Sequence, residues 1–278
     1  MLEVTFFGVR GSTPCSGPET ARYGGNTSCV MVQVPGERPI VCDLGTGVRY
    51  LGNRMGLDEP FDGTVLLTHL HWDHIQGLPF FTPILRPGAS MDIVAPIQEG
   101  KTLAEAMDEG LAPPLFPIRM SELPGKIEYR EISEGSFELG SATVTVFPVT
   151  HVGPTSGYRI DHGGASMVYI SDYQQPLDGT LSVAETVQDV CRGVDILIHD
   201  AQYDPEEFET KATWGHCTVD YAVEVAKVVE AKRLLLYHHD PAHDDDWVDR
   251  STERARDMAD GCCEVFSAAE GLVLHSES

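Results

Sequence analysis

The stretch His69-Leu70-His71-Trp72-Asp73-His74 places three imidazoles and one carboxylate within six residues. It follows an apolar run that is typical of a short β-strand. On a strand, His69 and His71 would face the same side, and a turn or helix start would then bring Asp73 and His74 to the same point. Imidazole and carboxylate groups are ligands of zinc, iron and manganese. Burying this many polar groups without a metal would be costly, so the stretch predicts a metal site.

Other apolar runs of the chain end in the same way. Six of them deliver a histidine or an aspartate at their C-terminal end, at Asp43, His69, His151, Asp172, His199-Asp200 and His238-His239. Strands that only build a core need no polar ending, whereas α/β proteins place their sites beyond the strand ends. We therefore expect these side chains to form one polar cluster on a rigid rim.

The number of candidate ligands indicates more than one metal ion. Seven nitrogen or oxygen ligands are available, which is too many for one tetrahedral zinc ion: His69, His71, Asp73, His74, His151, Asp172 and His238. Seven suits two divalent ions that share a bridging carboxylate and a bridging hydroxide, about 3.5–4 Å apart. The pattern predicts a hydrolase with two divalent ions, zinc being preferred and manganese or iron left open.

The same residues resemble the metallo-β-lactamase fold superfamily, through the motif His69-x-His71-x-Asp73-His74 and the later His151, Asp172 and His238. Further stretches resemble its phosphodiesterase and RNase Z-like branch, namely residues 7–14, 22–27, 43–47, 199–203 and 214–218. The resemblance implies an α/β fold, a four-layer αβ/βα sandwich of two mixed β-sheets with helices on the outer faces. It covers the whole chain, and we expect a single domain over residues 1–278.

The resemblance also implies roles for single residues. One ion would be held by His69, His71 and His151, and the other by Asp73, His74 and His238. Asp172 would bridge the two ions, and Asp73 would also accept a proton from the bridging water. His216, paired with Asp200, resembles the acid–base pair of the branch, and it would neutralise a phosphoryl oxygen or protonate the leaving oxygen.

Several of these residues have a second interpretation. A structural hydrogen bond is the alternative for His216 and Asp200. His239 competes with His238 for the last ligand position, and His238 fits the spacing of the branch better. Asp43 is expected to support a ligand histidine rather than to bind metal itself. Cys217 stands where the branch often has serine, and we expect it to pack rather than to react.

Composition limits the partners of the protein. The 278 residues include 43 acidic and 19 basic side chains, so 43 − 19 gives a net charge of −24. This charge argues against non-specific binding to nucleic acids and against docking on an anionic membrane. The seven cysteines form no Cys-x-x-Cys pair, and no signal peptide or membrane-spanning run is present, so we expect a reducing cytoplasm.

Hydrophobic patterns predict more strands than helices. Helices are expected over 101–109, 181–192, 219–231 and 247–259, the last two capped by Thr218 and Asp246. Strands are expected over 3–7, 29–34, 40–42, 64–68, 91–94, 143–148, 166–170, 195–198, 233–237, 264–266 and 272–274. The proline-rich segment 112–117 is expected to be a packed loop, either over the site or in a homodimer interface.

The substrate is the harder question. RNase Z-type enzymes hold tRNA with a basic arm, and none is found between Asp172 and His199 or elsewhere. We therefore expect a phosphodiesterase for a small phosphodiester such as a cyclic nucleotide, with binding of extended nucleic acid disfavoured and a nucleotide or RNA end left open. The alternatives are an RNase Z-like endoribonuclease, a thioester or lactone hydrolase on the same metals, and a metal sensor without turnover.

Overall fold

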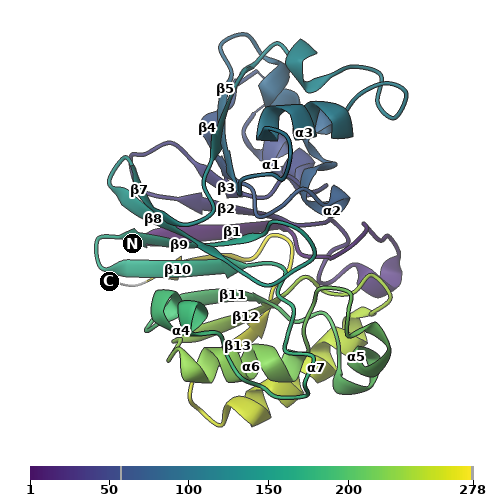
Figure 1. The fold of residues 1–278 in the computed structure, drawn as a ribbon, viewed down its shortest axis with the longest axis vertical. Coiled ribbons are helices and arrows are strands. Elements are labelled where there is room, and N and C mark those ends of the chain that lie inside the picture. The colour runs from purple at the N-terminus through teal and green to yellow at the C-terminus, as the bar shows by residue number, and fades with distance from the viewer. Residues whose placement is uncertain (57, 277–278) are drawn as a thin grey trace.

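The computed structural model describes residues 1–56 and 58–276 and contains two seven-stranded β-sheets (Figure 1). The first sheet has the strand order β14-β1-β2-β3-β4-β5-β6. Its strands are β1 (Leu2–Gly8), β2 (Cys29–Gln33), β3 (Ile40–Cys42), β4 (Asp62–Leu66), β5 (Ser90–Ala95), β6 (Lys126–Glu131) and β14 (Val273–Ser276). Strands β3 to β6 are parallel, and the pairs from β14 to β3 are antiparallel.

The second sheet repeats this mixed plan in the order β13-β12-β11-β10-β9-β8-β7. Its strands are β7 (Gly135–Leu139), β8 (Ala142–Pro148), β9 (Ser156–His162), β10 (Ala165–Ile170), β11 (Ile196–Asp200), β12 (Arg233–Tyr237) and β13 (Glu264–Ser267). Strands β10 to β13 are parallel. Because β8 and β10 are both antiparallel to β9, they run in the same direction. The C-terminal ends of β8, β10, β11 and β12 therefore share one edge.

Apolar side chains hold the two sheets together face to face. The core between the sheets includes Phe6 and Val30 of the first sheet and Val144, Ile160 and Ile196 of the second, all fully buried. The central strands are apolar on both faces, as is usual when helices cover the outer side of a sheet. The strand β10, for example, is buried along its entire length.

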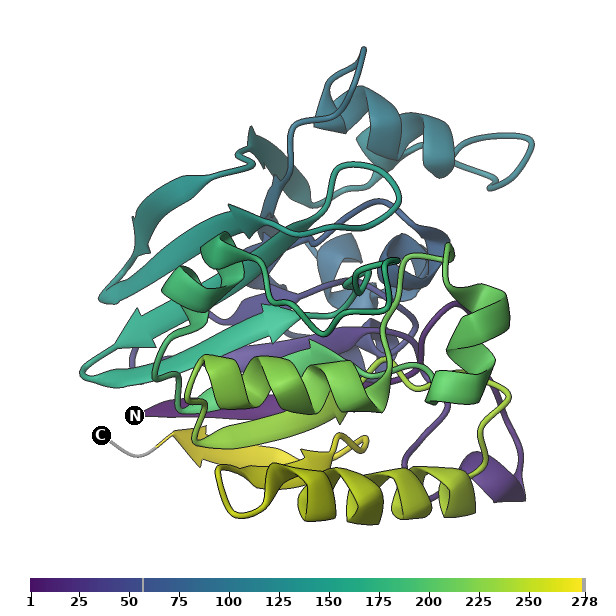
Figure 2. The same ribbon diagram turned by 60° about the horizontal axis from the view of Figure 1, so that its bottom comes forward.

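Helices cover the outer face of each sheet, which completes the expected four layers. The first sheet packs against α1 (Val48–Arg54) and α3 (Leu103–Gly110), and the second against α4 (Glu185–Cys191), α6 (Val219–Val228) and α7 (Asp245–Ala259). Figure 2 shows α6 in green and α7 in yellow-green lying side by side along the strands. The remaining helices lie in loops: α2 (Trp72–Ile75), α5 (Pro205–Lys211), η1 (Pro18–Thr20), η2 (Leu78–Phe80), η3 (Thr82–Leu85) and η4 (Met120–Glu122).

All the strands and helices predicted from the sequence are present, with ends shifted by a few residues. The strands β6, β7 and β9 and the helices α1 and α5 were not predicted, and α2 was expected only as a turn or helix start. Strand β6 is exposed along much of its length and has no apolar run. Helix α5 buries none of its residues, so it lacks the apolar stripe that marks a packed helix.

Helix caps agree with the sequence in one case and differ in another. The Thr218 side chain accepts a hydrogen bond from the Tyr221 amide and caps α6, as predicted. The prediction of Asp246 as the cap of α7 is wrong. Asp244 takes this position, because its backbone is extended and its carboxylate accepts from the Trp247 amide at 2.7 Å. Asp246 already lies in the first helical turn.

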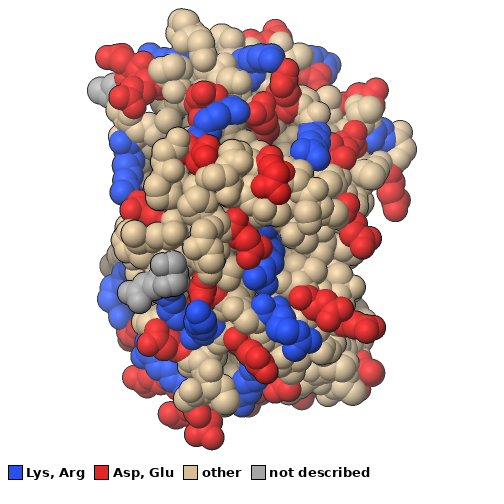
Figure 3. Space-filling model, turned by 90° about the vertical axis from the view of Figure 1, so that its left-hand side faces the viewer, with Lys and Arg blue, Asp and Glu red and all other residues tan. Residues whose placement is uncertain are grey.

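Leu2 and Ser276 lie at the edge of the sandwich away from the strand ends that carry the polar residues (Figure 1). Strand β14 pairs with β1, with Leu2 opposite Ser276. Figure 3 shows this edge, on which Lys and Arg side chains are interspersed with Asp and Glu. Among the described residues, no helix has the length and apolar character needed to cross a membrane.

Replacing the observed cap should destabilise the protein more than replacing the predicted one. We expect Asp244→Ala to lower the free energy of unfolding by about 1 kcal/mol, because it leaves an amide of the first turn of α7 without an acceptor. Asp246→Ala removes only an exposed contact with Arg22, so its effect should stay within about 0.5 kcal/mol. Urea denaturation of both variants measures the difference. Equal effects would contradict the assignment of the cap.

Candidate metal centre

The strand ends of both sheets bring the seven predicted ligands to one place. The loop after β4 and the helix α2 contribute His69, His71, Asp73 and His74, and the ends of β8, β10 and β12 are followed by His151, Asp172 and His238. The potential ligand atoms form overlapping groups of three, in each of which the atoms lie within 4.8 Å of one another. His69, His71 and His151 make one group, and Asp73, His74 and His238 make another.

The segment that carries four of these residues differs from its predicted shape. Strand β4 ends at Leu66, so His69 and His71 lie on a loop and not on a strand. His71 is the N-cap of α2, with an extended backbone. The start of α2 then turns Asp73 and His74 inward, as expected of a helix start, and both are buried.

The two groups of three have distances that suit metal coordination. His71 Nδ1 lies 3.1 Å from His151 Nε2. In the other group, Asp73 Oδ2 lies 3.2 Å from both His74 Nε2 and His238 Nε2. Ligand atoms about 2.1 Å from a shared zinc ion are separated by roughly 3.4 Å in a tetrahedron. The observed distances are close to that value.

Asp172 lies between the two groups. Its Oδ1 atom is 3.8 Å from His69 Nε2 and from His151 Nε2, and 3.4 Å from His238 Nε2. Its Oδ2 atom is 3.2 Å from His74 Nε2. One carboxylate thus reaches ligand atoms of both groups, which is the position of a bridging ligand.

Hydrogen bonds on the far side of the rings fix which nitrogen faces the centre. His151 Nδ1 donates to the Gly215 carbonyl at 2.6 Å, and His74 Nδ1 donates to Asp43 Oδ2 at 2.8 Å. His238 Nδ1 donates to the Gln202 side-chain oxygen at 2.9 Å. In a neutral ring whose Nδ1 carries the hydrogen, Nε2 presents a lone pair. These contacts therefore aim three lone pairs at the centre.

Asp43 organises this outer layer. Its carboxylate accepts hydrogen bonds from four donors: the Thr68 amide, the Thr68 hydroxyl, His74 Nδ1 and the Tyr169 hydroxyl. The contact with a candidate ligand histidine was predicted, whereas Tyr169 was not. Tyr169 lies on β10, so Asp43 links the two sheets. Gln202 was also missed, although it lies in one of the stretches that carry the family resemblance.

The electrostatic setting differs between the two groups of histidines. Burial and the neighbouring imidazoles lower the pKa values of His69, His71 and His151, which favours the neutral form that binds metal. Burial also disfavours charge on His74, but the carboxylates of Asp73, Asp172 and Asp43 raise its pKa above the ordinary value. Against the effect of burial, His238, His74 and His69 hold the pKa of Asp172 well below its usual range.

Three buried polar atoms of the cluster make no well-aligned hydrogen bond to the described residues, although two of them, His74 Nε2 and Asp172 Oδ2, lie 3.2 Å apart. They are His69 Nε2, His74 Nε2 and Asp172 Oδ2. Leaving a buried polar atom unpaired costs about 1–3 kcal/mol, and more for a charged group. All three face the centre, where a cation would satisfy them together. The donor set, nitrogen and oxygen only, fits divalent zinc, manganese or iron.

The proposed acid–base pair lies at the edge of this cluster. His216 Nδ1 is 3.0 Å from Asp200 Oδ2, and Asp200 is held by the amides of Tyr173 and Gln202. His216 Nδ1 is also 3.7 Å from Asp172 Oδ1. The pair thus adjoins the candidate bridging carboxylate.

Neighbouring residues that competed for roles lie outside the cluster. The ring of His239 bonds to the Ala268 carbonyl through Nε2 and packs against Tyr23. His199 is buried between Tyr173 and Tyr221. The Cys217 thiol donates to the Asp200 carbonyl at 3.0 Å, and burial raises its pKa, so it is a poor nucleophile.

Backbone strain is concentrated around the centre. Ser12, Asp43 and His238 have positive φ angles of 60°, 62° and 60°, although none is a glycine. Such conformations cost of order 1–3 kcal/mol each and persist where the surroundings impose them. The Ser12 amide donates to Asp73 Oδ2 at 2.7 Å. At Gly11, a Cβ atom would overlap the His238 ring, so only glycine allows this loop to approach.

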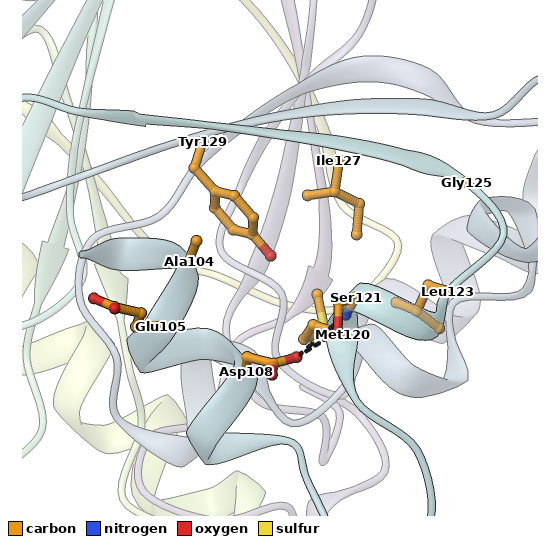
Figure 4. A pocket seen from close by; sticks show the side chains of 9 residues that line it. All are labelled: Ala104, Glu105, Asp108, Met120, Ser121, Leu123, Gly125, Ile127 and Tyr129. Atoms are coloured by element: carbon orange, nitrogen blue, oxygen red, sulfur yellow. Dashed lines mark hydrogen bonds between the residues drawn. The ribbon is translucent and has the colours of Figure 1, made fainter. Parts of the chain in front are cut away.

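Two other features lie away from this chemistry. Figure 4 shows a pocket of about 400 Å³ between α3, η4 and β6, where Asp108 bonds to Ser121, and none of its lining residues belongs to the candidate site. In the proline-rich segment 112–117, the Phe116 ring packs edge-on against Phe80, 6.1 Å between centroids. Ala112 is buried and Phe116 half-buried, but Pro113, Pro114, Leu115 and Pro117 are exposed, so the prediction of a packed loop is wrong for most of the segment. Its use as a lid or an interface stays a prediction.

Comparison with known proteins places this geometry in a family. Residues 38–239 match the model of the Beta-lactamase superfamily domain. Ribonuclease Z of Natronomonas pharaonis is 26% identical, over 85% of this chain and 86% of that protein. Among solved structures, the metallo-beta-lactamase fold protein YhfI of Bacillus subtilis has a TM-score of 0.73 at 19% identity and covers 98% of both chains. A diphosphatase of the PhnP family has a TM-score of 0.73 at 21% identity, covering 100% of this chain and 98% of that one.

Changing Asp43 should weaken metal binding without a direct contact to metal. In Asp43→Asn, the side-chain amide has one acceptor oxygen in place of the two carboxylate oxygens that now accept from four donors. We expect the hydrogen bond that orients the His74 ring to be lost. We expect the affinity for zinc to fall roughly 10- to 100-fold, measured by competition with a chelator. Asp195→Asn is the matched control, because Asp195 is also buried but bonds to Ser166 away from the centre. An equal loss in both variants would assign Asp43 a general structural role.

Proposed function

The chain belongs to the beta-lactamase superfamily and is a metal-dependent hydrolase, and we propose that it hydrolyses small phosphodiesters at a centre of two divalent ions. The observation that carries the proposal is the joint presence of the seven convergent ligands and the adjacent His216–Asp200 pair. We assign His69, His71 and His151 to one ion and Asp73, His74 and His238 to the other, with Asp172 as the bridge and zinc as the preferred metal.

The chemistry divides between the ions and the protein. When bound, two divalent ions would supply an activated water and a positive field for the phosphoryl group. His216 would donate a proton to the leaving oxygen, since Asp200 holds its Nδ1 hydrogen and leaves Nε2 toward the substrate. The carboxylate of Asp73, held by the Ser12 amide, is our candidate for accepting the proton of the attacking water.

The size of the substrate follows from charge. The chain carries a net charge of −24, and between Asp172 and His199 its one basic residue is Arg192. In the structure this segment contains a loop and the helix α4, which carries Glu185 and Asp189. A long polyanion needs many Lys and Arg contacts to displace its counterions. A small phosphodiester needs only the local positive charge that bound ions would supply.

A second candidate is an RNase Z-like endoribonuclease. The observation in its favour is the match to Ribonuclease Z of Natronomonas pharaonis over most of both chains. The same ligands and the same acid–base pair would serve this reaction. The two candidates differ in how the rest of the substrate is held, and the acidic surface supports the smaller one.

The metal stoichiometry and the role of His216 can be tested together. We expect the purified protein to contain two divalent ions per chain by elemental analysis, and EDTA to abolish hydrolysis of bis(p-nitrophenyl) phosphate. His216→Ala should lower kcat about 10²- to 10⁴-fold, because the variant loses the proton donor. It should retain both ions, because no metal ligand is removed.

The matched control is His162→Ala, which removes a histidine at the end of β9, beside Ser141 and far from the cluster. This variant should keep the parental kcat and metal content. Loss of an ion from His216→Ala would instead make His216 a ligand. Fewer than one ion per chain in the parent protein would overturn the two-ion proposal.

Substrate size is tested by direct competition between the two candidates. At equal enzyme concentration, we expect turnover of cyclic mononucleotides and little cleavage of precursor tRNA, because a net charge of −24 disfavours the binding of a long polyanion. Steady-state rates on both substrates at several salt concentrations measure this. Activity on the RNA alone would favour the endoribonuclease. Activity only on thioesters or lactones would contradict both candidate functions.

A further inference from the structure

Three large apolar side chains beside the metal centre are exposed to solvent. Trp72, Val152 and Trp214 are 54%, 55% and 61% exposed. We call these three residues the apolar rim. Large exposed apolar groups that lie together on a protein surface mark places where a ligand or a partner binds.

A continuous chain of contacts joins the backbone positions from which the rim projects. Trp72 follows His71, and Val152 follows His151, whose ring nitrogens approach to 3.1 Å. Trp214 precedes Gly215, whose carbonyl accepts the His151 Nδ1 hydrogen at 2.6 Å. A Cβ atom on Gly215 would lie 3.4 Å from Val152 Cγ2, so the two residues are in contact. The rim therefore lies along the side of the centre formed by His71 and His151.

The rim also lies beside the proposed proton donor. His216 is the next residue after Gly215, and its ring centroid is 5.3 Å from that of His151. A proton donor must be within hydrogen-bond reach of the leaving oxygen. The group attached to that oxygen would then extend over the rim. Near His238, the exposed residues Ser12 and Thr13 follow Gly11 and are polar.

The chemistry of the rim favours a flat aromatic group over a charged one. Lys211 lies beside the rim, with its Nζ 5.9 Å from the centroid of the Trp214 ring, and it is paired with Asp240 at 3.0 Å. The rim thus offers aromatic faces and little free positive charge. Tryptophan faces stack on nucleobases regardless of their sequence. A lipid chain would need apolar surface but no flat face.

We propose that the apolar rim binds the nucleobase on the leaving-group side of the substrate, with Trp214 and Trp72 as stacking residues. This inference rests on the proposed phosphodiesterase function and narrows its substrate class to nucleotide-containing diesters. Trp214 and Trp72 are specificity-determining residues in this assignment, because they contact the base and not the reacting atoms.

The test compares two monophosphates that differ only in the base. AMP and ribose 5-phosphate carry the same phosphate, and their dissociation constants for the metal-loaded protein give the contribution of adenine. We expect AMP to bind roughly 5- to 150-fold more tightly, the range that one stacked base supplies. AMP should also quench tryptophan fluorescence. Trp214→Leu and Trp72→Leu should each reduce the preference for AMP and the quenching, whereas Trp214→Phe should keep most of both.

The third tryptophan of the chain provides the matched control. Trp247 stacks on His243 at 3.4 Å between centroids, on α7, so Trp247→Phe should leave the AMP preference and the quenching unchanged. Equal binding of AMP and ribose 5-phosphate by a protein that hydrolyses bis(p-nitrophenyl) phosphate would overturn the rim and leave the proposed function in place. A preference for AMP in a protein that hydrolyses no phosphodiester would support the rim and overturn the proposed function. Tighter binding of octyl phosphate than of AMP would assign the rim to an aliphatic chain and overturn the proposal.

Discussion

The carboxylate of Asp43 is the contact on which the rest of the centre depends. It is fully buried, its backbone has a positive φ angle, and its four donors come from three parts of the fold. Thr68 positions His69 through a 3.0 Å contact, His74 leads into α2, and Tyr169 belongs to the second sheet. Each such bond contributes only about 1 kcal/mol to stability, but an unpaired carboxylate in this place would cost several times more. The sheets must therefore meet in one register, and that register places the ligands.

Two other tyrosines make the same kind of connection between the sheets. Tyr158 of β9 donates to the Leu67 carbonyl at 2.7 Å, and Tyr237 of β12 donates to the Gly8 carbonyl at 2.7 Å. Both rings are fully buried, so each hydroxyl satisfies a backbone oxygen that the sandwich removes from water. Together with Tyr169, they hold the second sheet against the loops that begin at Gly8 and Leu67. These loops lead to Ser12 and His69, so the packing of the two sheets also fixes the positions of residues at the site.

The sequence predicted those features that depend on local pattern. The strand before Asp172 was predicted because apolar runs and polar endings are visible in one short window, and the same holds for His238. Contacts between distant segments leave no such pattern. The bonds from Tyr169 to Asp43 and from His238 to Gln202 join residues far apart in the chain, and they could not be predicted. Strand β9 was missed because it begins with Ser-Gly and ends with Asp-His, which reads as a turn.

The origin of the candidate ligands in both sheets has a consequence for the mechanics of the protein. His69 and His74 lie on the loop and helix that follow β4 of the first sheet, and His151, Asp172 and His238 follow strands of the second, so ions bound by both sets would cross-link the sandwich at one edge. The sheets could not separate there without releasing the ions, and the unfolded chain would not hold the ligands together. Metal occupancy would then add directly to the free energy of unfolding, by about 4 kcal/mol when the free metal is at a thousand times its dissociation constant. The same ions would then take part in catalysis and also stabilise the fold.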